Sequence, residues 1–271
     1  GDWDLPKLKD LLQEIDTGEF DIEITGFDEK EIEDLMNQLF IPDENEKDDD
    51  VPEVPEEPIT KLGDLYKLGE HRLLCGDATL IDDVERLMDG QKADMVFTDP
   101  PYGIDLDTDY SSLNSKLEFV KDKHLKKKTG NTYNKVIGDN IDYDPSHLFA
   151  IFPNIKEMFL WGGDYYLKRL PDGGSFFVWD KRCGEQFDKM YGSCFELCWS
   201  KVKHKRDIIR HVWAGVFGTE QEDIRGRVHP TQKPIAVCSH FINKYSDKDN
   251  LIIDLFGGSG STLIACEKLK R

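Results

Sequence analysis

The sequence predicts an α/β fold in which helices cover a mostly parallel sheet. Between residues 59 and 271, short apolar runs of strand length alternate with stretches whose apolar positions have helical spacing. Two of these runs lead directly into loops rich in Pro or Gly. Such alternation is typical of parallel sheets, and open parallel sheets bind ligands beyond the carboxyl ends of their strands, where both loops would lie.

The net charge of −19 comes almost entirely from the N-terminal segment of the chain. Residues 1–58 contain 22 acidic and 4 basic side chains, whereas residues 59–271 contain 32 acidic and 31 basic ones. The larger part of the chain is therefore nearly neutral, and local basic clusters in it can face phosphate groups.

This N-terminal segment predicts a small appendage followed by a linker. Apolar residues recur at helical spacing in 4–15 and 28–40, so we expect two short helices within residues 1–40. Residues 41–58 are acidic and contain four prolines. Such a composition cannot bury enough apolar surface to offset the entropy of ordering, so we expect a linker there and a domain over residues 59–271.

Composition also bears on the location of the protein and on its cysteines. No run approaches the about 20 apolar residues of a membrane helix, and the N-terminus lacks the layout of a signal peptide, so we expect a cytoplasmic protein without a membrane partner. The cysteines include no Cys-x-x-Cys pair and no His at zinc-ligand spacing, so we expect buried free thiols and no metal. They are Cys75, Cys183, Cys194, Cys198, Cys238 and Cys266.

The elements of the main domain follow one another in order. The predicted strands are 72–75, 95–98, 158–161, 175–179 and 251–256, and the predicted helices among them are 80–89 and 261–270. Two segments break the alternation, because 112–135 is polar and rich in lysine and 181–227 mixes Lys and Arg with aromatic residues. A solvated face and a nucleic-acid surface both fit these charges.

A rigid polar loop follows the predicted strand 95–98. It reads Asp99-Pro100-Pro101-Tyr102. Two prolines fix the backbone and remove two N–H donors, which leaves carbonyl acceptors in set directions beside the Asp99 carboxylate. A wall of acceptors and a plain tight turn are both compatible with this tetrapeptide.

A glycine-rich turn follows the predicted strand 251–256 and opens the predicted helix 261–270. The segment Asp254-Leu-Phe-Gly-Gly-Ser-Gly-Ser-Thr262 places glycines at 257, 258 and 260. Glycines allow a ligand to approach the backbone closely, and a helix N-terminus favours a carboxylate or phosphate. A nicotinamide or flavin nucleotide is an alternative ligand, although the spacing is not Gly-x-Gly-x-x-Gly.

Together, these segments resemble the S-adenosylmethionine-dependent amino-methyltransferases of DNA. The resemblance is to the permuted group, often called the beta class, in which the catalytic motif precedes the cofactor motif. It covers roughly residues 60–271, and further matching pieces are Leu74-Cys-Gly-Asp-Ala78, Trp161-Gly-Gly-Asp-Tyr165, Phe177-Val-Trp-Asp-Lys181 and His229-Pro-Thr-Gln-Lys-Pro234. It implies a Rossmann-like, circularly permuted sheet with helices on both faces and a target-recognition insertion at about 181–227.

The resemblance also implies a cofactor site. S-adenosylmethionine would be the cofactor and S-adenosylhomocysteine the product. The residues implied as contacts are Asp77, Thr231, Lys233, Asp254, Phe256, Gly257, Gly258 and Gly260. Two of them have structural alternatives, because Asp77 could cap the helix beginning near Leu80 and Phe256 could belong to the core.

The chemistry implied is methylation of the N6 amine of adenine in DNA after base flipping. If the amine donates its N–H groups to the Asp99 carboxylate and the Pro100 carbonyl, its lone pair can face the methyl group for an in-line displacement, with Tyr102 stacked on the base. Asp99 at the first motif position favours adenine over the N4 amine of cytosine. Methylation of cytosine C5 is excluded because the sequence contains no Pro-Cys pair.

Other functions stay open at this point. The chain could be a DNA-binding or partition protein with an inactive methylase fold, an amino-methyltransferase of RNA or protein, or a dehydrogenase. If double-stranded DNA is the partner, the basic residues expected to contact it are Lys126, Lys127, Lys128, Lys181, Arg182, Lys203, Lys205, Arg206 and Arg210. A homodimer, a cognate restriction enzyme and association with the nucleoid are further expectations of this function.

Both ends of the chain predict a longer natural protein. Residues 1–45 resemble the tail of the ParB-like domain in phage and prophage methylase fusions. The sheet of the resembled family runs in the order 3-2-1-4-5-7-6, and strand 2 would follow the helix 261–270. A missing interior strand exposes backbone groups, so we expect the natural protein to continue past Arg271 and cofactor binding to be weaker in a chain that stops there.

Overall fold

In the computed structural model, the described residues are 58–109, 132–184, 192–211, 213 and 229–271. The chain divides into two units, Gly1–Val54 and Pro55–Arg271, and all described residues lie in the second. The helices predicted in the appendage, almost all of the linker and most of the lysine-rich segment lie outside the described residues.

A six-stranded sheet forms the centre of the second unit. Its strands are β3 (Met95–Thr98), β4 (Glu157–Trp161), β5 (Ser175–Asp180), β6 (Phe195–Ser200), β7 (Ile208–Arg210) and β8 (Ile252–Ile253), in the order β7-β5-β6-β4-β3-β8. β3 is parallel to β4 and β8, and β5 is parallel to β7, whereas β6 is antiparallel to both of its neighbours. The prediction of a mostly parallel α/β fold is confirmed.

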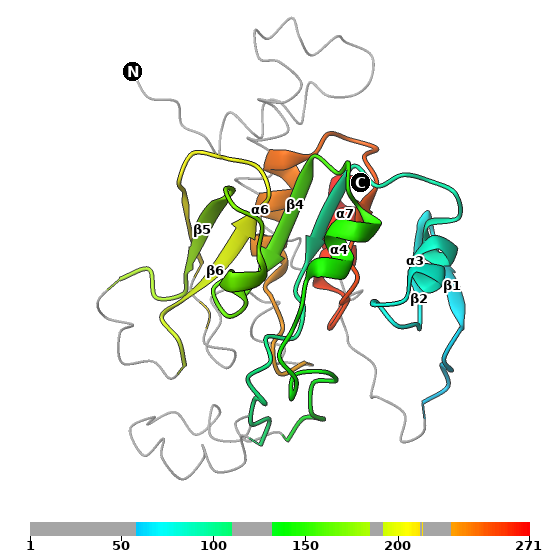
Figure 1. The fold of residues 1–271 in the computed structure, drawn as a ribbon, viewed down its shortest axis with the longest axis horizontal. Coiled ribbons are helices and arrows are strands. Elements are labelled where there is room, and N and C mark those ends of the chain that lie inside the picture. The colour runs from blue at the N-terminus through cyan, green and yellow to red at the C-terminus, as the bar shows by residue number, and fades with distance from the viewer. Residues whose placement is uncertain (1–57, 110–131, 185–191, 212, 214–228) are drawn as a thin grey trace, which may run out of the picture. The chain divides into compact units, whose positions relative to one another are not determined.

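Helices cover both faces of this sheet (Figure 1). Every residue of β3 is buried, as expected of a parallel strand covered on both sides. Met95 and Phe97 belong to a cluster that also contains residues of α6 (Ile235–Tyr245) and α7 (Ser261–Leu269). Val96 belongs to the opposite cluster, which contains residues of α3 (Ile81–Met88) and α4 (Ser146–Ile151).

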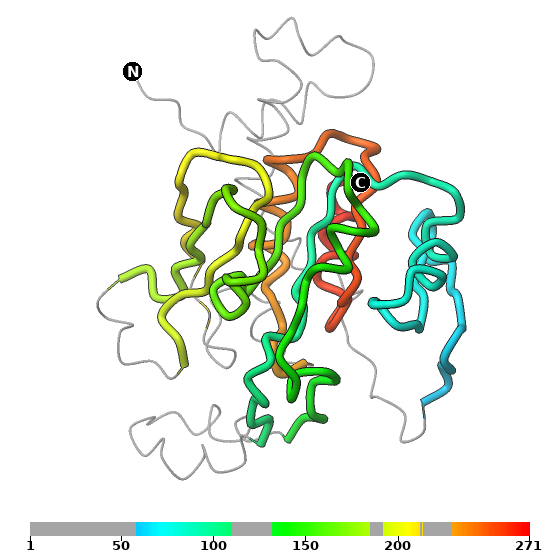
Figure 2. The backbone as a smooth tube through the Cα atoms, in the orientation of Figure 1, coloured from blue at the N-terminus to red at the C-terminus, as the bar shows by residue number. Residues whose placement is uncertain are grey.

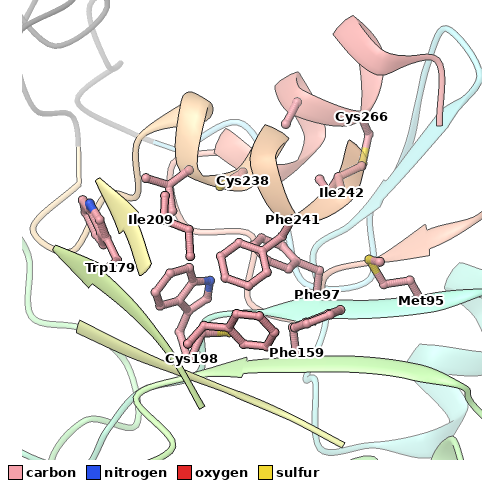
Figure 3. Packing of buried hydrophobic residues seen from close by; sticks show 14 of the residues in the cluster. Met95, Phe97, Phe159, Trp179, Cys198, Ile209, Cys238, Phe241, Ile242 and Cys266 are labelled. Atoms are coloured by element: carbon pink, nitrogen blue, oxygen red, sulfur yellow. The ribbon is translucent and has the colours of Figure 1, made fainter. Parts of the chain in front are cut away.

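Aromatic side chains fill the core between the sheet and α6 (Figure 3). The ring of Phe241 lies 5.6 Å from that of Phe97 and 5.3 Å from those of Phe159 and Phe177, measured between centroids. Tilted and edge-on aromatic pairs of this kind stabilise a core beyond their buried area. The strands that carry the polar loops are therefore held on a rigid base.

The prediction was wrong for the place of one strand. The predicted strand 72–75 corresponds to β2 (His71–Leu74). Within the described ranges, β2 pairs with β1 (Leu65–Leu68) alone, antiparallel, in a separate two-stranded sheet. An interior parallel strand is buried on both faces, and His71 and Arg72 do not suit such a position. The predicted strand 251–256 is also shorter in the structure, where β8 covers only two residues.

Several elements were not predicted. β6 and β7 lie inside the segment assigned to target recognition, and α6 follows directly on the His-Pro-Thr-Gln-Lys-Pro motif. β6 is therefore part of the main sheet, between β4 and β5. All six cysteines are free, as predicted, but only Cys198, Cys238 and Cys266 are buried. No helix in the described ranges is long and apolar enough to cross a membrane.

Candidate active site

The loop that follows β3 is held in place by one buried carboxylate. Asp139 Oδ1 accepts the backbone N–H groups of Tyr102 at 3.0 Å and Gly103 at 2.9 Å, and Oδ2 accepts that of Leu106 at 2.8 Å. Residues 99–109 and 132–143 run side by side (Figure 2). The polar loop is thus a fixed structure, and no motif in the sequence had pointed to Asp139.

Two groups hold the Asp99 carboxylate at the end of β3. The Tyr102 hydroxyl donates to Oδ1 at 2.7 Å, and the ammonium group of Lys233 donates to Oδ2 at 2.6 Å. The Lys233 side chain is only 7% exposed. It also lies 3.0 Å from Glu196 Oε2, and Glu196 in turn pairs with Lys181. Two ammonium groups and two carboxylates therefore alternate in a row that ends at Asp99.

The row stabilises its own charges. Burial by itself lowers the pKa of Lys233, but the carboxylates of Asp99 and Glu196 raise that pKa well above its ordinary value. Burial by itself raises the pKa of Glu196, but the ammonium groups of Lys233 and Lys181 lower it to about 2. At neutral pH, Lys233 is an ammonium ion and Glu196 a carboxylate. Burial and the charge of Asp99 raise the pKa of Tyr102, so its hydroxyl stays a donor.

Two tyrosines form an aromatic platform beside Asp99. The rings of Tyr102 and Tyr165 stack with their centroids 4.9 Å apart and their planes 15° apart. Tyr165 is 54% exposed, so the platform reaches the surface. Gly162 makes room for it, because a Cβ atom at that position would lie 2.2 Å from the Tyr102 ring. Gly162 also adopts a φ of +68°, which favours glycine.

A side-chain contact joins the glycine turn to β3. The Thr98 hydroxyl donates to Asp254 Oδ1 at 2.6 Å and accepts the N–H of Leu255 at 3.2 Å. The same Asp254 oxygen accepts the N–H of Phe256 at 3.1 Å. Burial raises the pKa of Asp254. Asp254, predicted as a cofactor contact, therefore fixes the start of the turn against β3.

The segment from His229 to Pro234 lies against the same turn. The Ser261 hydroxyl donates to the backbone carbonyl of Lys233 at 2.7 Å, and a Cβ atom at Gly258 would lie 3.9 Å from the His229 ring. Thr231 contacts His229 Nδ1 through its hydroxyl at 3.2 Å. Thr231 and Lys233 therefore lie on a segment that packs against the glycine turn, and the Lys233 ammonium group reaches Asp99. Their role as cofactor contacts stays a prediction.

Two other predicted cofactor residues have local partners. The Phe256 ring packs edge-on against Tyr143, with centroids 5.9 Å apart. Asp77 is exposed, and its Oδ1 accepts the backbone N–H of Thr79 at 2.9 Å and the Thr79 hydroxyl at 2.7 Å. The residue before α3, Leu80, receives no side-chain capping bond. Asp77 therefore shapes the turn before the helix and does not cap it.

The basic residues expected at DNA fall into three groups. Lys126, Lys127 and Lys128 lie outside the described residues. Lys181 and Arg182 turn inward: the Lys181 side chain is 12% exposed and pairs with Glu196, and Arg182 is 3% exposed and donates to the carbonyl of Gly192. The exposed members of the set are Lys203, Lys205, Arg206 and Arg210. Among the described residues, no cluster of His, Cys, Asp and Glu could hold a metal ion.

Comparisons with known proteins match two stretches of the chain. Residues 181–271 match a family described as DNA methylase, and residues 6–62 match a family described as the ParB-methyltransferase HTH domain. The Type II methyltransferase M2.MboI of Moraxella bovis is 42% identical over 69 residues, which make up 26% of this chain. The match spans 23% of the length of that protein.

Solved structures of DNA methyltransferases show a distant likeness. The crystal structure of M1.HpyAVI aligns with 72% of this chain and 85% of its own, with 16% identity and a TM-score of 0.35. The cytosine-N4-specific PvuII DNA methyltransferase aligns with 72% of this chain and 77% of its own, with 15% identity and a TM-score of 0.39. Likeness at this level carries no argument about the activity of this chain.

Proposed function

We propose that the chain transfers a methyl group from S-adenosylmethionine to the exocyclic N6 amine of adenine in double-stranded DNA. One observation carries the proposal: a buried cation ties the Asp99 carboxylate to the segment that packs on the glycine turn. A methyl acceptor at Asp99 and a methyl donor at the turn would then lie on one rigid frame. The matches of residues 181–271 and 6–62 to DNA methylase and ParB-methyltransferase families support the same interpretation.

The glycine turn suits the methionine end of the proposed cofactor. Gly258 and Gly260 have φ values of +50° and +81°, and Gly257 and Gly260 have free space where a Cβ atom would project. The turn opens the nine-residue helix α7, whose N-terminal N–H groups favour a carboxylate. Bound S-adenosylmethionine would supply an electrophilic methyl group on a sulfonium sulfur.

The residues around Asp99 would orient and activate the amine. The lone pair of an exocyclic amine is delocalised into the base, and donation of an N–H group to the Asp99 carboxylate makes it available for attack. The N–C bond would form as the S–C bond of the donor breaks, and the Asp99 carboxylate, as the acceptor of the amine N–H, would take up the proton that the amine must then lose. Tyr102 and Lys233 hold that carboxylate in one orientation, which places the reacting groups before the reaction begins.

Adenine is the proposed base, and the aromatic platform is its proposed binding surface. Stacking on an aromatic ring contributes about 1–3 kcal/mol per base, which offsets much of the cost of taking the base out of the duplex. Tyr165, which stacks on Tyr102 and is 54% exposed, would offer such a surface. The N4 amine of cytosine could use the same acceptors, so the identity of the base needs a direct measurement.

Methylation of plasmid DNA tests the proposal. The full chain is incubated with plasmid DNA and S-adenosylmethionine, and the modified bases are mapped and compared with those produced by Asp99→Ala. We expect N6-methyladenine from the wild-type chain and at least about a 1,000-fold lower rate from the variant, since Asp99 is the proposed acceptor of the amine. N4-methylcytosine would reassign the base. DNA binding without any methylation would favour an inactive methylase fold instead.

A further inference from the structure

An open groove lies along β5 and β7, on the part of the sheet farthest from β8. It has a volume of about 980 Å³. Phe176, Val178 and Ile208 give it an apolar floor, and basic side chains from the β6–β7 connection and from the end of β7 line it. It contains none of the residues that form the proposed methylation site.

Strand directions place the two ends of this groove. β6 is antiparallel to both β4 and β5, so β4 and β5 run in the same direction. Asp180, the last residue of β5, therefore lies at the same end of the sheet as Thr98 of β3 and Trp161 of β4. Arg210 pairs in register with Asp180 and marks the catalytic end. The connection 201–207 marks the other end, because it follows the last residue of β6. Six residues of β5 make the groove about 17 Å long.

The basic connection is anchored at its centre. The N–H of His204 donates to the Ser175 hydroxyl at 2.7 Å, and His204 Nε2 lies 3.0 Å from Glu157 Oε2. The His204 ring also stacks on Phe159, with centroids 5.9 Å apart. Because His204 is fixed, Lys203 on one side of it and Lys205 on the other are presented at the surface in a defined place.

The groove is cationic in a chain whose net charge is −19. Lys203, Lys205 and Arg206 are exposed, and in the described part of the chain they form no ion pair. The acidic residue that lines the groove is Asp207. Its carboxylate accepts a hydrogen bond from the Lys244 ammonium group at 2.6 Å, and this bond lowers the pKa of Asp207. The lining therefore offers several positive charges and no unpaired acid to oppose them.

We propose that this groove binds the phosphate backbone of double-stranded DNA beyond the target base. The inference deepens the proposed function and rests on it. A length of about 17 Å spans roughly five phosphates of one strand along the duplex axis, and Lys and Arg side chains neutralise such phosphates without reading sequence. The groove begins at the catalytic end of the sheet, so DNA bound there continues past the site of methyl transfer.

The salt dependence of DNA binding tests this inference. The affinity for a 30-base-pair DNA duplex is measured between 50 and 200 mM salt, without cofactor, for the full chain and for the triple variant Lys203→Gln, Lys205→Gln and Arg206→Gln. The logarithm of the affinity falls as the logarithm of the salt concentration rises, and each phosphate that is no longer neutralised should make this negative slope less steep by about 0.9. For three replaced side chains, we expect the steepness to decrease by about 2 to 3. A control variant with the same change of charge replaces the exposed Lys92, Lys156 and Lys248 with Gln.

The outcomes separate this inference from the proposed function. A salt dependence that is less steep in the groove variant but not in the control supports DNA binding by the groove, whether or not the chain methylates DNA. Equal slopes in the two variants overturn the groove, even if the wild-type chain methylates plasmid DNA. An RNA duplex of the same sequence is titrated in parallel, and tighter, groove-dependent binding of that duplex would overturn DNA as the partner.

Discussion

Replacing Glu196 with Gln removes one charge from the row formed by Lys181, Glu196, Lys233 and Asp99, and it leaves the shape of the side chain nearly unchanged. In the wild-type chain, the Glu196 carboxylate pairs with Lys181 and lies 3.0 Å from the Lys233 ammonium group. Gln keeps one oxygen as an acceptor but no negative charge, so both ammonium groups lose their shared counter-charge. Removing one member of a buried ion pair leaves an uncompensated charge and is strongly destabilising.

The magnitude follows from the pKa of Glu196. This pKa falls from 4.5 to about 2 on folding, which corresponds to about 3 kcal/mol of folding free energy at neutral pH. A carboxylate whose pKa is depressed in the folded state stabilises that state fully above the unfolded pKa. This stabilisation is lost as the pH falls from about 4.5 towards 2. Glu196→Gln should therefore be less stable than the wild type by up to about 3 kcal/mol at pH 7, and the gap should narrow below about pH 4.5.

Urea unfolding at a series of pH values from 7 to 3 measures this gap. Glu70→Gln is the matched control, because Glu70 is exposed and its replacement makes the same change of charge. We expect the control to stay within about 0.5 kcal/mol of the wild type at every pH. A Glu196→Gln variant as stable as the control at pH 7, or a gap that does not change with pH, would refute the proposed charge row.

Three further changes test other parts of the site. Asp139→Ala removes the carboxylate that accepts the N–H groups of the polar loop. A resulting displacement of the loop by about 1 Å should lower kcat for methyl transfer by about 100-fold. The circular dichroism spectrum should be unchanged. An unaltered kcat would mean that the loop needs no such support. Gly162→Ala forces the Tyr102 ring aside. We expect kcat for methyl transfer to fall at least 10-fold, which corresponds to a rise of roughly 1.4 kcal/mol in the activation free energy. Full activity of this variant would show that the Tyr102 ring does not lie against Gly162. Thr98→Val leaves buried Asp254 without its hydroxyl donor and should cost about 1–3 kcal/mol in urea unfolding, whereas Thr98→Ser should restore most of it; equal stability of the Val variant would contradict the role of this contact.

The elements that the sequence predicts best are those in which consecutive residues are apolar and buried. β3 was predicted with its observed bounds, because a fully buried parallel strand is a continuous apolar run. The helix 80–89 agrees with α3 within a residue at each end. β6 was missed because its sequence, Phe-Glu-Leu-Cys-Trp-Ser, contains Glu196 and lies in a segment assigned to DNA recognition. That glutamate is tolerated in the sheet only because two lysines distant in sequence neutralise it.

The candidate site shows the same limit. The tetrapeptide 99–102 and the glycine turn were found because their residue types are local and unusual. The family resemblance predicted Lys233 as a cofactor contact, whereas the structure pairs its ammonium group with Asp99. The two positions are 134 residues apart, and no spacing rule predicts such a pair. Asp139 carries no motif at all, since an acidic residue on a loop has no sequence signal until its backbone partners are known. Lys181 was assigned to DNA for the corresponding reason, because a lysine looks exposed until a buried carboxylate is placed beside it.

Thr98 and Lys233 explain why the polar loop and the glycine turn could act as one unit although they lie at opposite ends of the domain sequence. Thr98 precedes Asp99 on β3 and bonds to Asp254 at the start of the turn, while Lys233 bonds to Asp99 through its side chain and to Ser261 through its carbonyl. The two connections close a ring through β3, the turn and the 229–234 segment. In-line transfer depends on the distance between an acceptor and a donor, and a 1 Å error is costly. Two independent connections fix that distance better than either alone, so a variant that lacks both the Thr98 and the Lys233 side-chain bonds should have a kcat lowered by more than the product of the single effects.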